Sequence, residues 1–188
     1  MQLFIVPILA ALVLSGPAAA QNWQEYGYPD YAFKVSFPDD PRIETTTYQV
    51  ADDHAVEAHV YSVTRDNAEF EVTIAELAGS GLEETAVIDY AIKALSAGGE
   101  MKVNIPHRIN RVFGRQLSFV QRDGSRATVA LFDYKGRLYQ IVGKSPANGT
   151  DATADTIRIQ ASLNACRSLT VVAAYSPCGQ SRAWAFKG

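Results

Sequence analysis

The three histidines and two cysteines of the chain are its residues best suited to metal binding or proton transfer, and their spacing favours neither chemistry. His54, His59 and His107 lack the H-E-x-x-H spacing of a zinc protease, and eleven residues separate Cys166 from Cys178, too many for a redox motif. His59 falls in a β-prone segment, where we expect a surface or cross-strand residue and not a general base. The sequence therefore predicts no metal and no cofactor.

Motifs for nucleophilic catalysis and phosphate binding are also missing. The sequence contains no G-x-S-x-G elbow and no Ser-x-x-Lys pair. The adjacent carboxylates Glu83 and Glu84 fall at the start of a predicted helix, where they favour the helix dipole. We therefore expect a protein that is not an enzyme, unless folding assembles a catalytic site from residues far apart in sequence.

The first twenty residues resemble a secretory signal peptide. MQLFIVPILAALVLSGPAAA combines an apolar run with a Gly-Pro break and an A-x-A cleavage site, although it carries no Lys or Arg at its start. Cleavage after Ala20 would leave 168 of the 188 residues, a usual length for one domain. We expect residues 1–20 to be the signal peptide and the mature chain, periplasmic or secreted, to have no transmembrane segment.

Export bears on the two cysteines, because disulfides persist in oxidising compartments. A bond between Cys166 and Cys178 would pin a C-terminal tail, residues 166–188, to the last predicted helix. The alternative is that one or both remain buried thiols. Residues 21–165 form the single expected domain.

The net charge of −3 hides a strong polarity along the chain. Residues 1–100 hold 16 acids and 4 bases, whereas residues 101–188 hold 4 acids and 13 bases. One interpretation is that the two halves interleave in one sheet and neutralise each other across strands. The other interpretation is a basic face that binds an anionic partner. In an exported chain that partner would be a protein, a lipid, lipopolysaccharide or a cell-wall polymer, and not nucleic acid. The candidate residues of the basic face are Lys102, His107, Arg108, Arg111, Arg115, Arg122 and Arg126.

Alternation and turn residues predict an α+β chain. Expected strands cover residues 32–37, 43–50, 56–64 and 68–77 as a meander, followed by 101–105, 111–121, 127–134 and 138–143. A helix capped by a Ser80–Glu83 capping box carries Ile88, Ala91, Ile92 and Leu95 on one stripe. A second helix is expected from Thr150 or Asp151 to about Ala165.

Aromatic residues crowd the start of the expected mature chain. Phe33, Val35 and Phe37 alternate with polar residues, which predicts a strand with this face in the core. The rings before that strand form either a flap packed over the sheet or the rim of a small-molecule groove. They are Trp23, Tyr26, Tyr28 and Tyr31.

The strand YAFKVSFP, the later hairpins ending in LYQIVG and a final helix ending in ASL together resemble the PsbP-like family over about residues 30–165. That family includes extrinsic subunits of photosystem II and many small exported bacterial proteins of unassigned role. The resemblance implies a central antiparallel sheet of about six to eight strands flanked by two main helices, an α/β/α sandwich, and provides no catalytic motif.

These observations favour an exported accessory or binding protein without catalytic activity, which binds an anionic partner through its basic strands. The alternative is a small-molecule-binding periplasmic protein that uses the aromatic flap and a groove in the sheet.

Overall fold

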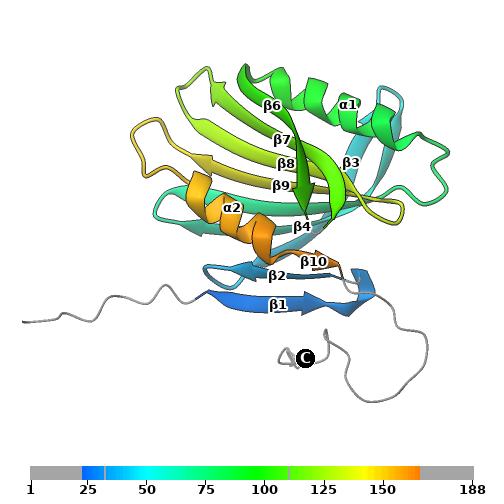
Figure 1. The fold of residues 1–188 in the computed structure, drawn as a ribbon, viewed down its shortest axis with the longest axis horizontal. Helices are drawn as coiled ribbons and strands as arrows, with labels where there is room; N and C mark the ends of the chain where they lie inside the picture. The colour runs from blue at the N-terminus through cyan, green and yellow to red at the C-terminus, as the bar shows by residue number, and fades with distance from the viewer. Residues whose placement is uncertain (1–22, 32, 110, 166–188) are drawn as a thin grey trace, which may run out of the picture.

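The protein is described by a computed structural model over residues 23–31, 33–109 and 111–165. Its centre is a seven-stranded antiparallel sheet in the order β3-β4-β5-β9-β8-β7-β6 (Figure 1). The predicted α+β architecture with a central antiparallel sheet is confirmed. The strands are β3 (Arg42–Ala51), β4 (His54–Arg65), β5 (Ala68–Glu76), β6 (Gly99–Ile109), β7 (Val112–Gln121), β8 (Arg126–Asp133) and β9 (Arg137–Ser145).

Short hairpins connect most neighbouring strands of this sheet. The β8–β9 turn places Lys135 at φ 55° and Gly136 at φ 72°, a pair of left-handed residues that suits the twist of two-residue hairpins. The Gly136 carbonyl also accepts a hydrogen bond from the amide of Leu77, 2.8 Å away. This hydrogen bond connects the β8–β9 turn to the residue that follows β5, where the chain leaves the sheet toward the first helix.

A second, smaller sheet contains β1 (Gln24–Tyr28), β2 (Phe33–Phe37) and β10 (Asn164–Ala165) in the order β1-β2-β10. A short 3-10 turn, η1 (Pro29–Tyr31), links β1 to β2. The sequence predicted β2 as the first strand of the main meander, and this prediction is wrong: the Pro38–Pro41 turn takes the chain from the small sheet to β3. The sequence also missed β1, because only Tyr26 and Tyr28 alternate within this five-residue segment.

Helix α1 (Glu84–Ser96) buries Val87, Ile88 and Ala91 against the main sheet. The predicted stripe is confirmed, but the capping box is wrong: Glu83 is the N-cap residue and no side chain caps the helix. The Ser80 hydroxyl instead accepts the amide of Leu82 at 3.3 Å, before the helix begins. Gly81, at φ 71°, separates Ser80 from the first turn.

Helix α2 (Thr153–Ser162) is shorter than predicted, with Ala152 as its N-cap residue. Asp151 still accepts the amide of Thr153 at 2.9 Å. The helix ends at Ser162 because the chain becomes extended at Leu163 and joins β2 as β10. It packs closely on β9, where any side chain at Gly143 would overlap the hydroxyl of Thr156.

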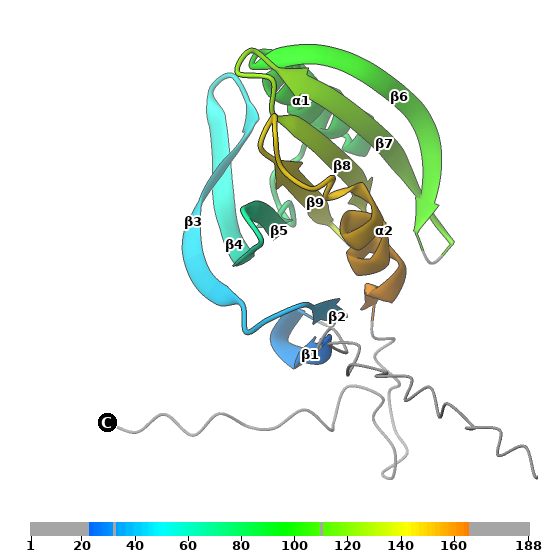
Figure 2. The same cartoon turned by 90° about the vertical axis from the view of Figure 1, so that its left-hand side faces the viewer.

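The two faces of the main sheet carry separate cores. On one face, α2 and the small sheet cover Phe70, Val72 and Ile141. On the other face, α1 covers Leu117 and Val129. Figures 1 and 2 show α2 between the main sheet and the small sheet, and α1 crossing the main sheet away from them. The predicted sandwich is thus present, with the small sheet added to the α2 layer.

Candidate functional site

The main sheet separates the two charge classes in space. The acid-rich half of the chain supplies the adjacent strands β3, β4 and β5, and the base-rich half supplies most of the remainder, with β6 and β7 at the opposite edge (Figure 2). The interleaving interpretation is therefore wrong. Consecutive antiparallel strands stay beside one another, so within the main sheet the two halves share a single boundary, the pair β5–β9.

Cross-strand ion pairs occur at that boundary, which we name the seam (β5 with β9). Glu69 lies directly opposite Lys144, and Glu76 directly opposite Arg137. Their ion-pair distances are 3.9 Å and 2.6 Å. Arg137 also donates to the Tyr31 carbonyl at 3.0 Å, so this pair holds the small sheet to the main one.

The opposite edge of the sheet, the hairpin β6–β7, contains basic side chains without acidic partners in the described residues. Arg108 lies 4.1 Å above the centroid of the Phe113 ring. The Arg115 Nε donates to Asn104 Oδ1 at 2.8 Å. Arg111, in the turn at φ 73°, is exposed, and within the described chain no side-chain hydrogen bond or ion pair involves Arg111 or His107.

The same hairpin exposes large apolar side chains. Ile105 is 52% exposed, Phe113 is 65% exposed and Val103 is 37% exposed, and they are three of the five exposed large hydrophobics in the described chain. Strand alternation places Val103 and Ile105 on one face with His107, and pairs Phe113 with Arg108 on the other. Both faces of the hairpin end therefore combine apolar and basic groups.

The structure divides the seven basic residues predicted as one face. Arg122 and Arg126 follow the far end of β7, whose ten residues span about 30 Å. Arg126 donates to the Gly149 carbonyl at 3.2 Å. Lys102 forms an ion pair with Glu100 at 2.6 Å. The hairpin end thus gathers His107, Arg108, Arg111 and Arg115.

The outer edge of β6 carries features that oppose pairing with a further strand. A register shift between Met101 and Val103 marks a bulge, Lys102 lies within it, and Pro106 removes one amide donor. Long exposed edge strands without such features tend to aggregate. A partner of this hairpin is therefore expected to bind its side chains and not its backbone edge.

The aromatic residues of the first strand pair contribute to packing. Phe33, Val35 and Phe37 are completely buried, which confirms the predicted core face. Tyr28 stacks on Phe33 with 4.8 Å between ring centroids, and burial raises its pKa above the ordinary range. Tyr26 donates to Asp40 at 2.6 Å.

The other two rings of the predicted groove also have partners. The guanidinium carbon of Arg158 lies 4.2 Å from the centroid of the Trp23 ring. Tyr31 contacts the ring of His59, with 4.4 Å between centroids. Together with Tyr26 and Tyr28, these rings pack against the core between the main sheet and α2, as the flap interpretation expects.

No protein-family model and no curated protein matches the chain. The structure is similar to the solution structure of cyanobacterial PsbP (CyanoP) from Synechocystis sp. PCC 6803, with a TM-score of 0.53 and 12% identity, over 82% of this chain and 98% of that one. The fold is PsbP-like. A protein from Bacteroides thetaiotaomicron VPI-5482 matches with a TM-score of 0.44 and 10% identity, over 77% of this chain and 48% of that one.

Within the PsbP-like fold, the environment of His59 agrees only in part with the expectation of a surface or cross-strand residue. It is a cross-strand residue, since Thr45 lies opposite it and their side chains are 3.2 Å apart, but it is buried and not on the surface. Its Nε2 lies 2.7 Å from the Tyr31 hydroxyl and 3.2 Å from Glu57. Only the docking of η1 onto β4 creates this cluster, so no local pattern predicts it.

Several predictions concern segments beyond the described part of the PsbP-like fold. The signal peptide at residues 1–20, the tail at 166–188 and the pairing of Cys166 with Cys178 all lie outside the described residues. Among the described residues, no helix is long and apolar enough to cross a membrane. In the same ranges, no three His, Cys, Asp or Glu side chains are grouped as a metal site requires.

Proposed function

We propose that this protein is an exported, non-catalytic binding protein, and that the end of its β6–β7 hairpin binds an anionic lipid surface. The observation that carries the proposal is the combination, at one edge of the sheet, of Arg108, Arg111 and Arg115 without acidic partners in the described chain. Exposed Phe113 lies on the same face of the hairpin as Arg108 and Arg115, and exposed Ile105 lies on the other face.

The apolar groups are the reason for preferring a lipid surface to a charged polymer. A basic residue close to an anionic membrane contributes about 1 kcal/mol of binding free energy, and this contribution weakens with salt. Side chains such as Ile105 and Phe113 gain further free energy by entering the boundary between headgroups and acyl chains. A cell-wall polymer offers the charge but no such apolar layer.

The bonding of His59 gives it a structural role in the fold. Both of its ring nitrogens contact side chains, with Thr45 at Nδ1 and with Tyr31 and Glu57 at Nε2. Hydrogen bonds of this kind hold an imidazole in place between the small sheet and β4. His107, on the hairpin, has no carboxylate within hydrogen-bonding distance in the described chain.

Vesicle binding tests the proposal directly. The protein is purified in the form that the cell accumulates, and its mass reports whether cleavage occurred after Ala20. Binding is measured with vesicles of phosphatidylcholine alone and with added phosphatidylglycerol, at low and high salt. We expect binding to the anionic vesicles only. The double variant Arg108→Gln/Arg111→Gln should bind about 30-fold more weakly, since it removes two basic contacts.

A matched control removes two exposed bases elsewhere. Arg42→Gln/Lys93→Gln makes the same change in net charge, on β3 at the opposite edge of the sheet and on α1, which leads into the end of β6 remote from the hairpin turn. It should bind as tightly as the unmodified protein. Equal losses in the two double variants, or equal binding to neutral vesicles, would show that the hairpin is not the binding surface.

A further inference from the structure

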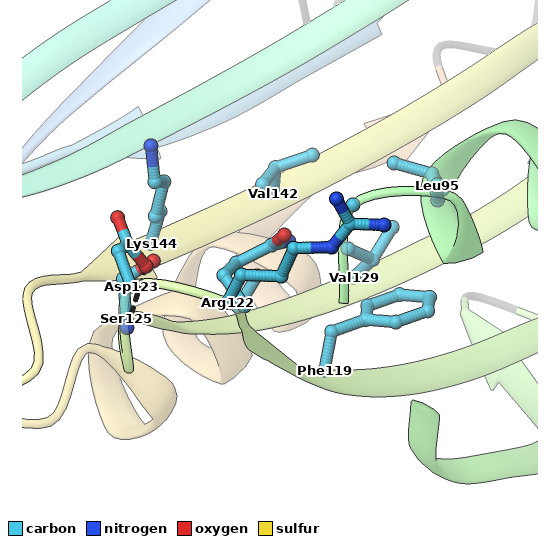
Figure 3. Close-up of a pocket in the computed structure, with 11 residues that line it drawn as sticks. Leu95, Phe119, Arg122, Asp123, Ser125, Val129, Val142 and Lys144 are labelled. Atoms are coloured by element: carbon cyan, nitrogen blue, oxygen red, sulfur yellow. Dashed lines mark hydrogen bonds between the residues drawn. The ribbon is translucent and has the colours of Figure 1, made fainter. Parts of the chain in front are cut away.

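A pocket of about 470 Å³ lies on the α1 face of the main sheet, between the end of α1 and the β7–β8 turn (Figure 3). This volume falls in the range of about 300–1,000 Å³ typical of small-molecule sites. The pocket is about 30 Å, the length of β7, from the turn of the β6–β7 hairpin. It contains neither histidine nor cysteine. Its apolar lining consists of Leu95, Phe119, Ala127, Val129 and Val142.

The apolar lining follows from strand alternation. Phe119 lies opposite Ala127 across the β7–β8 pair, and Val129 lies opposite Val142 across β8–β9. These positions continue the core that α1 covers. Leu95 is in the last turn of α1, and Gly98 follows it without a side chain, so the helix stops short of covering this part of the sheet.

Charged groups occupy the rim of the pocket, and they differ in how they are paired. The ammonium of Lys144 lies 3.9 Å from the carboxylate of Glu69, and it also interacts electrostatically with the carboxylate of Asp123. Asp123 accepts the amide of Ser125 at 2.9 Å. Arg122 has no hydrogen bond or ion pair within the described residues. Figure 3 shows its guanidinium extending away from Asp123, toward Leu95 and Val129.

We propose that this pocket binds a small aliphatic carboxylate, with its carboxylate on Arg122 and its chain against Leu95 and Val142, the partly exposed apolar residues of the lining. A guanidinium forms two parallel hydrogen bonds to a carboxylate. Arg122 carries this group and is the rim cation without an acidic partner in the described chain. The acids Asp123 and Glu69 lie on the Lys144 side, so the anion binds at the opposite side of the rim. Aliphatic side chains dominate the lining, which suits a saturated chain.

The experiment measures binding of decanoate, below its micelle-forming concentration, to the purified protein by calorimetry. Decanol is the neutral comparison with the same chain. We expect decanoate to bind at least about tenfold more tightly than decanol, and Arg122→Gln to remove this difference. Arg42→Gln, which removes an exposed arginine from β3 at the opposite edge of the sheet, should leave decanoate affinity unchanged.

Methyl NMR spectra locate the ligand. Decanoate should shift signals of Leu95, Val129 and Val142, and the spectrum of Arg122→Gln without ligand shows whether the variant is folded. Equal affinity for decanoate and decanol, an unchanged affinity in Arg122→Gln, or shifts confined to Ile105 on the hairpin would each overturn the proposal. The pocket is independent of the lipid-binding proposal, because Arg122→Gln should still bind anionic vesicles.

Discussion

The seam and the β6–β7 hairpin end use the same kinds of side chain in opposite ways. At the seam, Glu76 and Arg137 face each other at 2.6 Å, and Phe70 is 2% exposed. At the hairpin, Arg108 contacts only an aromatic ring in the described chain, and Phe113 is 65% exposed. The seam holds two layers of the fold together, whereas the hairpin carries groups that the fold does not use.

Position in the sheet explains this difference. β5 and β9 are central strands, and the side chains of Glu76 and Arg137 are only 28% and 25% exposed, so an unpaired charge there is costly. A missing apolar group in the core beside them is costly too. β6 is an edge strand, and six successive residues from Lys102 to His107 are exposed or only partly buried. Side chains at such an edge contribute little to stability and remain available for a partner.

The largest difference between the two regions is expected from truncating a phenylalanine in each. Phe70→Ala at the seam removes a buried ring and should lower the free energy of unfolding by about 3–5 kcal/mol. Phe113→Ala at the hairpin should change it by less than about 0.5 kcal/mol. Urea unfolding of both variants measures the difference, and similar losses would show that the hairpin end is packed in solution.

A smaller difference is expected from the arginines. Arg137→Gln breaks the pair with Glu76 and the bond to the Tyr31 carbonyl, and it should cost about 1.5–3 kcal/mol. Arg115→Gln loses only its contact with Asn104 and should be close to neutral. Thermal unfolding ranks the two, and a neutral Arg137→Gln would mean that the small sheet is held without this contact.

An effect smaller than that of Phe70→Ala or Arg137→Gln is expected at neutral pH for Tyr48, which donates to Gln140 of β9 at 2.8 Å. Burial, with Glu71 nearby, raises the pKa of Tyr48 from 10.0 to about 12. The unfolded chain therefore releases this proton first, and the stability it provides is lost as pH rises from about 10 through about 12.

The variant Tyr48→Phe tests whether the Tyr48 hydroxyl causes this loss of stability at high pH. At neutral pH it should cost about 0.5–1.5 kcal/mol for one neutral hydrogen bond. Between about pH 9 and about pH 11 its stability should fall less steeply than that of the unmodified protein. Urea unfolding across this range provides the comparison, with Tyr90→Phe, a partly buried tyrosine on α1, as control. Parallel pH profiles for Tyr48→Phe and the unmodified protein would contradict the assignment.

Local patterns predicted most of the elements but few of their contacts. The strands of the main sheet and α1 follow from alternation, helical periodicity and glycine turns, all of which act over a few residues. Strand β1 was missed because only two of its five residues, Tyr26 and Tyr28, alternate, and their partners on β2 and at Tyr61 are distant in sequence from Tyr28 or joined through a turn. The capping box failed because Gly81 turns the chain before the helix starts.

The candidate sites depended even more on contacts between distant segments. The sequence identified the basic residues and their polarity along the chain, but it grouped Arg122 with Arg111, which lie at opposite ends of β7. It gave no indication of the pocket beside Leu95, because three strands and a helix end must meet to form it. The partners of His59 were hidden for the same reason.

The sequence by itself determined that this chain is an α+β protein with a buried Phe33-Val35-Phe37 face and with acids and bases in separate halves. These properties depend on residue type and short spacing. Only the tertiary structure decided that the two charge classes meet at one seam of the main sheet, and that the bases of the hairpin end lack acidic partners in the described chain. Strand order determines which distant residues become neighbours, and a linear pattern does not specify that order.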